Sequence, residues 1–226
     1  NVSIPTYDGS TVGWAGEVDA AADGAGTFGE VELSPKRLTA YVDISKQFLI
    51  QDSVSAEALL RKDIVDAISN KLEATILGAE AGSTTKPAGL FNAVVADEAD
   101  ITYKDIVAME QKLEEANVSG NITFIASPYA KATLKTTAIG GTKSDVRMLM
   151  DSGEVDGYPV LVTNGMAKKG LILGNFNDLV IGQWGGIDLT VDPYTQAANG
   201  KIRLVVNAYF DAKPQRAASF VKKVLK

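Results

Sequence analysis

The stretch from residue 52 to residue 78 constrains the fold most, because it predicts one long helix with a continuous apolar side. Large aliphatic side chains recur there at every fourth residue, which is the spacing of one helix face. These residues are Leu60, Ile64, Ile68, Leu72 and Ile76. Polar and charged residues occupy the other sides. The apolar side therefore needs a sheet or a partner to cover it.

Both ends of this helix carry matching signals. Asp52, Ser53 and Ser55 can each accept a hydrogen bond from an N–H of the first turn, and Glu57 suits the positive end of the helix dipole. Gly78 supplies the stop. At ~1.5 Å per residue the helix is roughly 37 Å long. We expect it to be a spine flanked by β-rich segments.

The composition narrows the functional classes. The 226 residues, 46% hydrophobic and 22% charged, match ordinary globular usage and allow one large or two small domains. No apolar run reaches the ~18 residues that a membrane span requires. A net charge of −6 opposes nonspecific binding to DNA or anionic lipid. The chain has neither cysteine nor histidine, which removes thiol chemistry, the usual general base and the commonest metal ligand.

The N-terminal quarter predicts a projecting hairpin. Residues 1–27 are rich in Gly, Ala, Asp and Thr, so we expect an extended, mobile segment with little core. Period-two alternation then predicts strands at 28–33 and 37–45. We expect residues 11–20 to pair with them in a long hairpin whose tip lies near 21–27.

The rest of the chain predicts two more helical segments and a series of strands. Thr102 and Asp105 resemble a capping box that opens a helix from Tyr103 to Ala116. A strand at 122–126, followed by Ser127 and Pro128, predicts a β–α unit whose helix ends near Thr136. A short helix is expected around 145–150. Further strands are expected at 160–163, 171–173, 179–181, 187–191, 202–210 and 217–224, with a turn at 211–215 between the last two.

Two short motifs suggest chemistry, but their contexts contradict it. Residues 24–29 fit a dinucleotide fingerprint, with Asp43 as the later acid, yet that motif must open a helix and here a strand is predicted. Ser219 and Lys222 have the spacing of a serine–lysine pair, but in a strand they point to opposite faces. We read the first as a hairpin tip and the second as part of a strand.

Two other segments are equally weak candidates. Residues 78–83 lack the Gly-Lys pair of a phosphate loop and are better explained as a helix stop. Asp97, Glu98 and Asp100 have no neighbouring pocket signature and read as a solvated loop. We therefore assign no catalytic, cofactor-binding or metal-binding residue, expect no cofactor, and predict that the protein is not an enzyme.

The order of these parts resembles the major capsid proteins of tailed bacteriophages. The segment 28–36 with the strand after it looks like that family's extended loop, and Asp52-Ser53 opening the long helix looks like its spine. The turn at 82–90 is similar to the one that follows the family's spine. The resemblance continues through 121–134, 157–160, 173–176 and 187–192. No single motif is diagnostic, and the order over some 200 residues carries the resemblance.

The resemblance implies an α+β, Hong Kong 97-like capsid fold with a long spine helix, an extended β-hairpin loop, a peripheral domain and an axial domain. We expect a peripheral segment at 1–11, the extended loop at 12–45 and the peripheral domain with its spine at 46–118. The axial domain is expected at 119–190, and the return strands of the peripheral domain at 191–226.

The implied function is structural. The chain would form the pentamers and hexamers of an icosahedral phage or prophage head that encloses double-stranded DNA without sequence-specific binding. It would reside in the virion after assembly in the bacterial cytoplasm, with a scaffolding segment, a maturation protease and a portal as partners and no membrane. Removal of a scaffolding segment would explain the start at Asn1, as would a trimmed expression clone.

Two other functions stay open. An encapsulin-type compartment shares the fold but encloses protein cargo, and a neighbouring gene for a portal or for a cargo enzyme would discriminate. A secreted or surface binding protein would have a signal peptide upstream of Asn1.

Some members of this family join neighbouring subunits by an isopeptide bond between a loop Lys and an Asn, assisted by a Glu. Residues 1–35 contain no Lys or Arg, and Lys36 lies at the base of the loop. Asn199 stands in the acceptor region, but the strand at 204–208 has no Glu. We therefore expect any shell to be held without covalent bonds.

Overall fold

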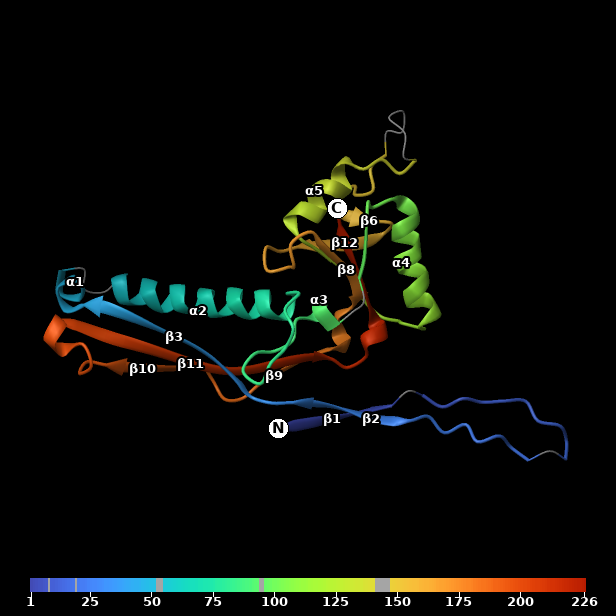
Figure 1. The fold of residues 1–226 in the computed structure, drawn as a ribbon, viewed down its shortest axis with the longest axis horizontal. Coiled ribbons are helices and arrows are strands. Elements are labelled where there is room, and N and C mark those ends of the chain that lie inside the picture. Colours follow the sequence, from blue (N-terminus) through green and yellow to red (C-terminus); the bar gives the residue numbers. More distant parts are fainter. Residues whose placement is uncertain (8, 19, 52–54, 94–95, 141–146) are drawn as a thin grey trace.

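A long helix lies along a four-stranded antiparallel sheet in the computed structural model, which describes residues 1–7, 9–18, 20–51, 55–93, 96–140 and 147–226. The helix is α2, Ser55–Ile76. The central strand β11, Lys201–Pro214, pairs along its first part with β10, Asp188–Asp192, and with β3, Lys36–Ser45. Its last part pairs with β9, Leu179–Gln183. The sheet thus runs the length of the helix (Figure 1).

The apolar stripe of α2 faces this sheet, as the sequence predicts. Ile64 and Ile68 are buried, and Leu60 and Leu72 are partly buried. They pack against side chains of β3 and β11 that alternate toward the helix, namely Ile44, Leu204, Val206, Ala208 and Phe210. Because strand side chains alternate in direction, one face of β11 supplies this whole row. The spine prediction is confirmed.

The helix ends as predicted, while its start cannot be compared. A Cβ atom on Gly78 would lie 2.5 Å from the carbonyl oxygen of Ala74, so only glycine fits where the chain leaves the helix. The predicted caps at Asp52, Ser53, Ser55 and Glu57 lie outside the described residues and side chains. A six-residue helix not predicted from the sequence, α1, Lys46–Gln51, follows β3.

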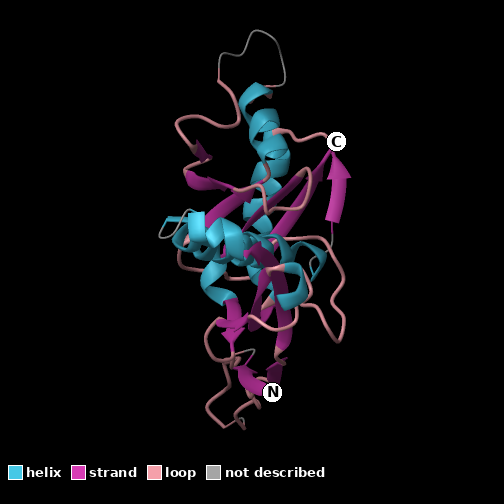
Figure 2. Cartoon of the chain, turned by 90° about the vertical axis from the view of Figure 1, so that its left-hand side faces the viewer, coloured by secondary structure: helices cyan, strands magenta, loops and turns pink. Residues whose placement is uncertain are grey.

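A second sheet forms the other part of the molecule. Its strands are, in spatial order, β4, Ala96–Ala99; β12, Phe220–Leu225; β8, Gly170–Asn175; β5, Ile122–Ala126; β7, Tyr158–Val162; and β6, Glu154–Val155. One face is covered by α4, Tyr103–Glu115, which packs on β12 and β8, and by α5, Pro128–Thr136, which packs on β5 and β8. Figure 2 shows these elements from the end of the molecule, with the N-terminus far from the C-terminus.

The other face of this sheet meets the end of the spine. Ile172 of β8 and Phe220 of β12 pack with Ile76, Leu77 and the short helix α3, Leu90–Ala93. Every residue of β8 is buried, because the strand lies between two cores. This explains its unbroken apolar run, since a strand covered on both faces loses the polar alternation.

Several local predictions are confirmed. The Asp105 carboxylate accepts hydrogen bonds from the N–H and the hydroxyl of Thr102 at 2.8 and 2.6 Å, as in a capping box. The Ser127 hydroxyl accepts from the N–H of Ala130 at 3.1 Å, and Pro128 is the first residue of α5. The predicted strands from 160 to 191 correspond to β7, β8, β9 and β10.

The predicted hairpin partner is wrong. The strand that pairs with β2, Phe28–Leu33, is β1, Val2–Tyr7, in a register from Val2 opposite Leu33 to Tyr7 opposite Phe28. The described part of 11–20 contains no strand. Two exposed side-chain hydrogen bonds link these strands, since Asn1 donates to Glu32 at 2.6 Å and Ser3 donates to Glu30 at 2.7 Å.

Two predictions near the C-terminal half are also wrong. Residues 147–150 form no helix, and Met148 makes an isolated bridge to Ala138; residues 145 and 146 lie outside the described part. The strands at 202–210 and 217–224 do not flank a turn at 211–215. Instead β11 continues to Pro214 because it pairs with β9, and β12 enters the other sheet beside β8.

The packing also differs from the division expected from the sequence. α4 and β12 pack with residues 122–175, although they were expected with the spine, whereas β9 pairs with β11 in the long sheet. Sequence order misleads here because the chain crosses between the two sheets several times.

The helix–sheet core generates a stability prediction. Ile68→Asp should lower the free energy of unfolding by roughly 3 kcal/mol or more, because it places an unpaired carboxylate against Val206 and Phe210. Val65→Asp is the matched control, because Val65 lies on the same helix and is 46% exposed. Urea unfolding would check both. Equal midpoints for the two variants would contradict the observed orientation of α2.

Candidate functional site

The described residues among 1–33 form an arm that projects away from both sheets (Figure 1). Its apolar side chains face solvent: Val12, Trp14 and Val18 are 95% exposed or more, and Phe28 is 83% exposed. Burial of apolar surface is worth about 25 cal/mol for each Å2, so these exposed side chains would gain stability by contact with a partner. The arm is the first candidate functional feature.

The arm is shaped by contacts within it that build no core. The ring of Tyr7 lies 4.7 Å from that of Phe28, centroid to centroid. The Tyr7 hydroxyl shares a hydrogen bond with the Ser10 hydroxyl at 2.6 Å and accepts one from the N–H of Gly26 at 3.0 Å, and these bonds, chiefly the first, lower the pKa of Tyr7. A backbone bond from the Thr11 N–H to the Gly24 carbonyl, 2.9 Å, crosses the loop.

A buried carboxylate anchors the base of the arm to the long sheet. The Asp211 side chain is 1% exposed and lies 2.6 Å from the Lys36 ammonium, which is 10% exposed. The same carboxylate accepts a hydrogen bond from the backbone N–H of Ser34 at 3.0 Å. Its other oxygen accepts from the N–H of Ala212, also at 3.0 Å. Asp211 thus joins β11 to the link between β2 and β3.

Two further contacts fix the direction of the arm. The Lys213 ammonium donates to the Glu32 carbonyl at 2.6 Å. Leu33 is 2% exposed, and its methyl group would lie 3.2 Å from a Cβ atom on Gly182, so a side chain at position 182 would crowd it. The arm therefore starts from a rigid base even though its tip is exposed.

The outer face of the long sheet carries a charged cluster. The Arg203 guanidinium forms a two-point ion pair with Asp43, at 2.7 and 2.8 Å, and lies over the Tyr41 ring at 4.2 Å. Arg203 lowers the pKa of Asp43, chiefly through these hydrogen bonds. Asp192, in register with Arg203 on β10, adds a second acid beside the guanidinium.

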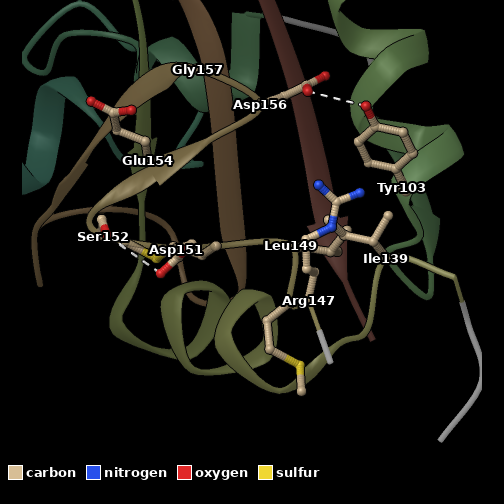
Figure 3. Close-up of a pocket in the computed structure, with 11 residues that line it drawn as sticks. Tyr103, Ile139, Arg147, Leu149, Asp151, Ser152, Glu154, Asp156 and Gly157 are labelled. Carbon is tan, nitrogen blue, oxygen red and sulfur yellow. Dashed lines mark hydrogen bonds between the residues drawn. The ribbon is translucent and has the colours of Figure 1, made fainter. Parts of the chain in front are cut away.

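A pocket of about 540 Å3 opens where α4 meets the segment around β6 (Figure 3). The Tyr103 hydroxyl donates to the Asp156 carboxylate at 3.1 Å, which raises the pKa of Tyr103. Ser152 donates to its neighbour Asp151 at 3.4 Å. The chain has no histidine to activate a serine, and these contacts do not form a nucleophile with an oriented base.

The structure places each short sequence motif in surroundings that do not suit the chemistry the motif suggests. Residues 24–29 lead into strand β2, so the helix of a dinucleotide site is missing there. They are not the predicted hairpin tip either, because Gly24 is bonded to Thr11 and Gly26 to Tyr7 on the opposite side of the arm. Ser219 ends a 3-10 helix, Ala217–Ser219, and does not lie in the predicted strand, which begins at Phe220. Its hydroxyl donates to Asp178, whereas the Lys222 ammonium donates to the Phe91 carbonyl. Residues 78–83 follow α2 and precede no helix N-terminus that could bind phosphate.

The remaining candidates are placed as follows. The loop predicted for the acids is wrong for two of them, because Asp97 and Glu98 lie in strand β4, where pairing with β12 extends the sheet. Asp100 follows the strand and is exposed. Lys36 is held by Asp211, and the exposed Asn199 donates to Gln196 at 2.7 Å.

Within the described ranges, no group of three or more acidic side chains is placed to hold a metal ion. None of the described helices has the length and hydrophobicity that crossing a membrane requires.

Sequence reasoning missed Asp211. Its signal is a lone acid between the apolar residues Phe210 and Ala212, which predicts a buried carboxylate with a specific partner. The partner lies 175 positions earlier in the chain, and no local pattern identifies it.

Comparison with known proteins points to one family. The model of the phage capsid family matches residues 1–225. The chain is 27% identical to a major capsid protein of Halomonas phage phiHAP-1 over 92% of this chain and 35% of that protein. It is 24% identical to that of Klebsiella oxytoca phage phiKO2 over 83% of this chain and 48% of that protein. The chain thus spans between a third and a half of these curated relatives.

Solved capsid structures share the fold. The capsid of the native GTA particle matches with a TM-score of 0.77 at 17% identity, over all of this chain and 84% of that one. A structure from Gordonia phage Cozz matches with a TM-score of 0.73 at 15% identity, over 99% and 81%. The shared architecture is an α+β capsid fold.

The buried anchor generates a second prediction. Asp211→Asn should lower the free energy of unfolding by about 3 kcal/mol, because it leaves the Lys36 ammonium buried without a counter-charge. Asp43→Asn is the control and should destabilise much less, since its pair with Arg203 is partly exposed. Lys36→Met combined with Asp211→Leu should recover part of the loss, because both charges are removed although the Ser34 and Ala212 N–H groups lose their acceptor. Urea denaturation that gives equal losses for Asp211→Asn and Asp43→Asn would contradict the anchor.

Proposed function

Because the chain belongs to the phage capsid family, we propose that it is a structural subunit of a phage or prophage head, with a Hong Kong 97-like fold. The observation that carries this proposal is the arm, with its exposed apolar side chains on a firmly anchored base. Such a segment gains stability only by burial on another molecule. In a shell, that molecule is a neighbouring copy.

In this proposal the two sheets have different places in the shell. The spine and the long sheet would form the peripheral domain, and the arm would be the extended loop. The six-stranded sheet with α4 and α5 would form the axial domain near the symmetry axis of a capsomer. The packing supports boundaries that follow the sheets, with α4 and β12 in the axial part and β9 in the peripheral part.

The proposed partners are further copies of the chain, arranged as pentamers and hexamers of a closed shell around double-stranded DNA. A scaffolding segment, a maturation protease and a portal would take part in assembly in the host cytoplasm, and the product would be the virion capsid. We propose no catalytic, cofactor or metal residue and no enzymatic activity. The named relatives are phage major capsid proteins, which favours a head over an encapsulin-type compartment.

Assembly of the purified chain tests this function. Electron microscopy and sedimentation should reveal rings or closed shells that form above a threshold concentration. A variant in which the dipeptide Asn-Gly replaces residues 8–27 should fold but not assemble, because the turn closes β1 onto β2 while the arm tip is lost. Sedimentation of the unaltered chain as a 23.8 kDa monomer at every concentration would contradict the proposal.

The contacts between subunits of such a shell should be noncovalent. Assembled particles boiled in detergent should give a single band near 23.8 kDa on a denaturing gel, because the arm carries no lysine for an isopeptide bond. A ladder of covalent multimers would show this expectation to be wrong.

A further inference from the structure

The long sheet has an open edge along β3. Its strands lie in the order β10, β11 and β3, and no described strand pairs with the far side of β3. The strand has ten residues, of which Thr39, Ala40 and Tyr41 in its middle are exposed. An unpaired edge of this length presents a row of backbone N–H and C=O groups that another strand can bind.

This edge lacks the features that usually prevent pairing. Folded proteins block sheet edges with very short strands, proline or lysine. Elsewhere in the described chain, the edge strands β6 and β4 have two and four residues, and β1 contains Pro5. Residues 37–43 of β3 contain no lysine, proline or glycine. The contrast indicates that the edge of β3 is available for pairing.

Hydrogen bonds of β11 show which backbone groups of β3 face outward. The Val206 carbonyl accepts from the Thr39 hydroxyl and so faces β3, whereas the Tyr209 carbonyl accepts from Trp184 on the other side. Backbone groups alternate in direction along a strand, and Val206 lies opposite Ala40, so the groups of Ala40 point to β11. Those of the odd-numbered residues therefore point outward, namely Arg37, Thr39, Tyr41 and Asp43.

A second copy of β3 is complementary to this edge when the two strands run antiparallel about a two-fold axis at Ala40. Every residue whose backbone groups point outward then lies opposite another such residue. Arg37 lies opposite Asp43 of the second copy, and Thr39 lies opposite Tyr41. The outward N–H and C=O groups of both copies can thus bond to each other.

The side chains that face α2 fit the same register. Leu38 and Val42 are apolar and partly buried, and each lies opposite the other in the second copy. Ala40 meets its own counterpart in a pair without backbone hydrogen bonds, where Cα atoms are only ~4.5 Å apart and a small side chain fits. The axis is perpendicular to the sheet, so the α2 helices of both copies lie on one face and the apolar rows continue beneath them.

Charge favours this register over its neighbour. Arg37 is exposed and forms no ion pair within the described part of the chain. It would lie opposite Asp43 of the second copy, whose pair with Arg203 is partly exposed. Opposite charges directly across antiparallel strands stabilise their pairing. An axis at Tyr41 would place Arg37 opposite Ser45 and lose both of these contacts.

The other edge of the long sheet is a poorer partner. β10 has five residues, so it would cover half of β3 and leave the rest of the edge open. A second β3 covers the edge along its whole exposed part.

We propose that β3 of one copy pairs with β3 of a second copy about a two-fold axis at Ala40, which joins two long sheets into one. This inference rests on the proposed function, since it names a contact between copies of the shell subunit. The contact is isologous, whereas the contacts that close a ring are head-to-tail. It would therefore join copies that belong to different rings of the shell.

A single cysteine tests the axis, because the chain has no cysteine of its own. In Ala40→Cys the two thiols lie within reach of a disulfide, since the ~4.5 Å between the Cα atoms of such a pair falls in the range that the bond requires. Protein oxidised under assembly conditions should give a dimer band on a non-reducing gel. Ser45→Cys is the matched control on the same strand. It is exposed, but its two copies would stand roughly 30 Å apart at ~3.3 Å per residue, so it should give no dimer.

Two substitutions in the Ala40→Cys chain test the chemistry of the pairing. Thr39→Pro removes an N–H that points outward and no backbone bond to β11, so it should lower the dimer yield by about tenfold or more. Arg37→Glu places two acids opposite each other and should lower the yield by about threefold or more. Lys104→Glu changes the net charge equally at an exposed site on α4 and should leave the yield unchanged. Melting temperatures establish that the variants are folded, and Arg37→Glu, which changes no backbone group, decides the matter if Thr39→Pro does not fold.

The outcomes separate this inference from the proposed function. Particles in which Ala40→Cys gives no dimer, or in which Ser45→Cys gives as much, would overturn the pairing of β3 and leave the shell function standing. A dimer whose yield neither Thr39→Pro nor Arg37→Glu lowers would also overturn the pairing, because the edge would then not be bound. A dimer from Ala40→Cys in a chain that forms no particles would support the pairing and contradict the shell function.

Discussion

The apolar stripe of α2 must be covered along its whole length, and most of the structure depends on how β11 meets that requirement. A helix of 22 residues needs a strand of comparable reach, and β11 has 14 residues, the most of any described strand. β11 aligns β3 and β10 under the helix and then pairs with β9 beside the second sheet. The helix–sheet core and the crossing between the two parts of the molecule therefore follow from one strand.

The arm is a consequence of the same strand. β3 follows β11 until Lys36, opposite Phe210, and the next residue of β11 is the buried Asp211. A buried carboxylate is costly unless it is paired and hydrogen-bonded, and here Lys36 and the Ser34 N–H satisfy it. The chain consequently leaves the sheet at a fixed point and in a fixed direction. An anchored base with an exposed apolar tip is what a segment that joins one subunit to the next requires.

Local patterns predicted the elements, whereas distant partnerships escaped them. The fourfold spacing from Leu60 to Ile76 identified both the spine and its buried side, and Thr102, Ser127 and Pro128 marked helix starts through bonds within one turn. The hairpin partner was wrong because 2–7 and 11–20 are both weakly patterned, so periodicity does not indicate which of them pairs with β2. Asp211 and the place of β12 depend on residues far away in sequence, which periodicity does not report. For the site, the sequence predicted a projecting loop without its own core but not its anchor.

The central claim is that the arm becomes ordered by burial on another copy, and hydrogen exchange tests it most directly. Amide exchange of residues 9–27 should be measured in dissociated subunits and again in assembled particles. We expect rapid exchange in the subunit and protection that rises by about a hundredfold or more in the particle, while β8 is protected in both. Equal exchange of residues 9–27 in the two states would contradict the account.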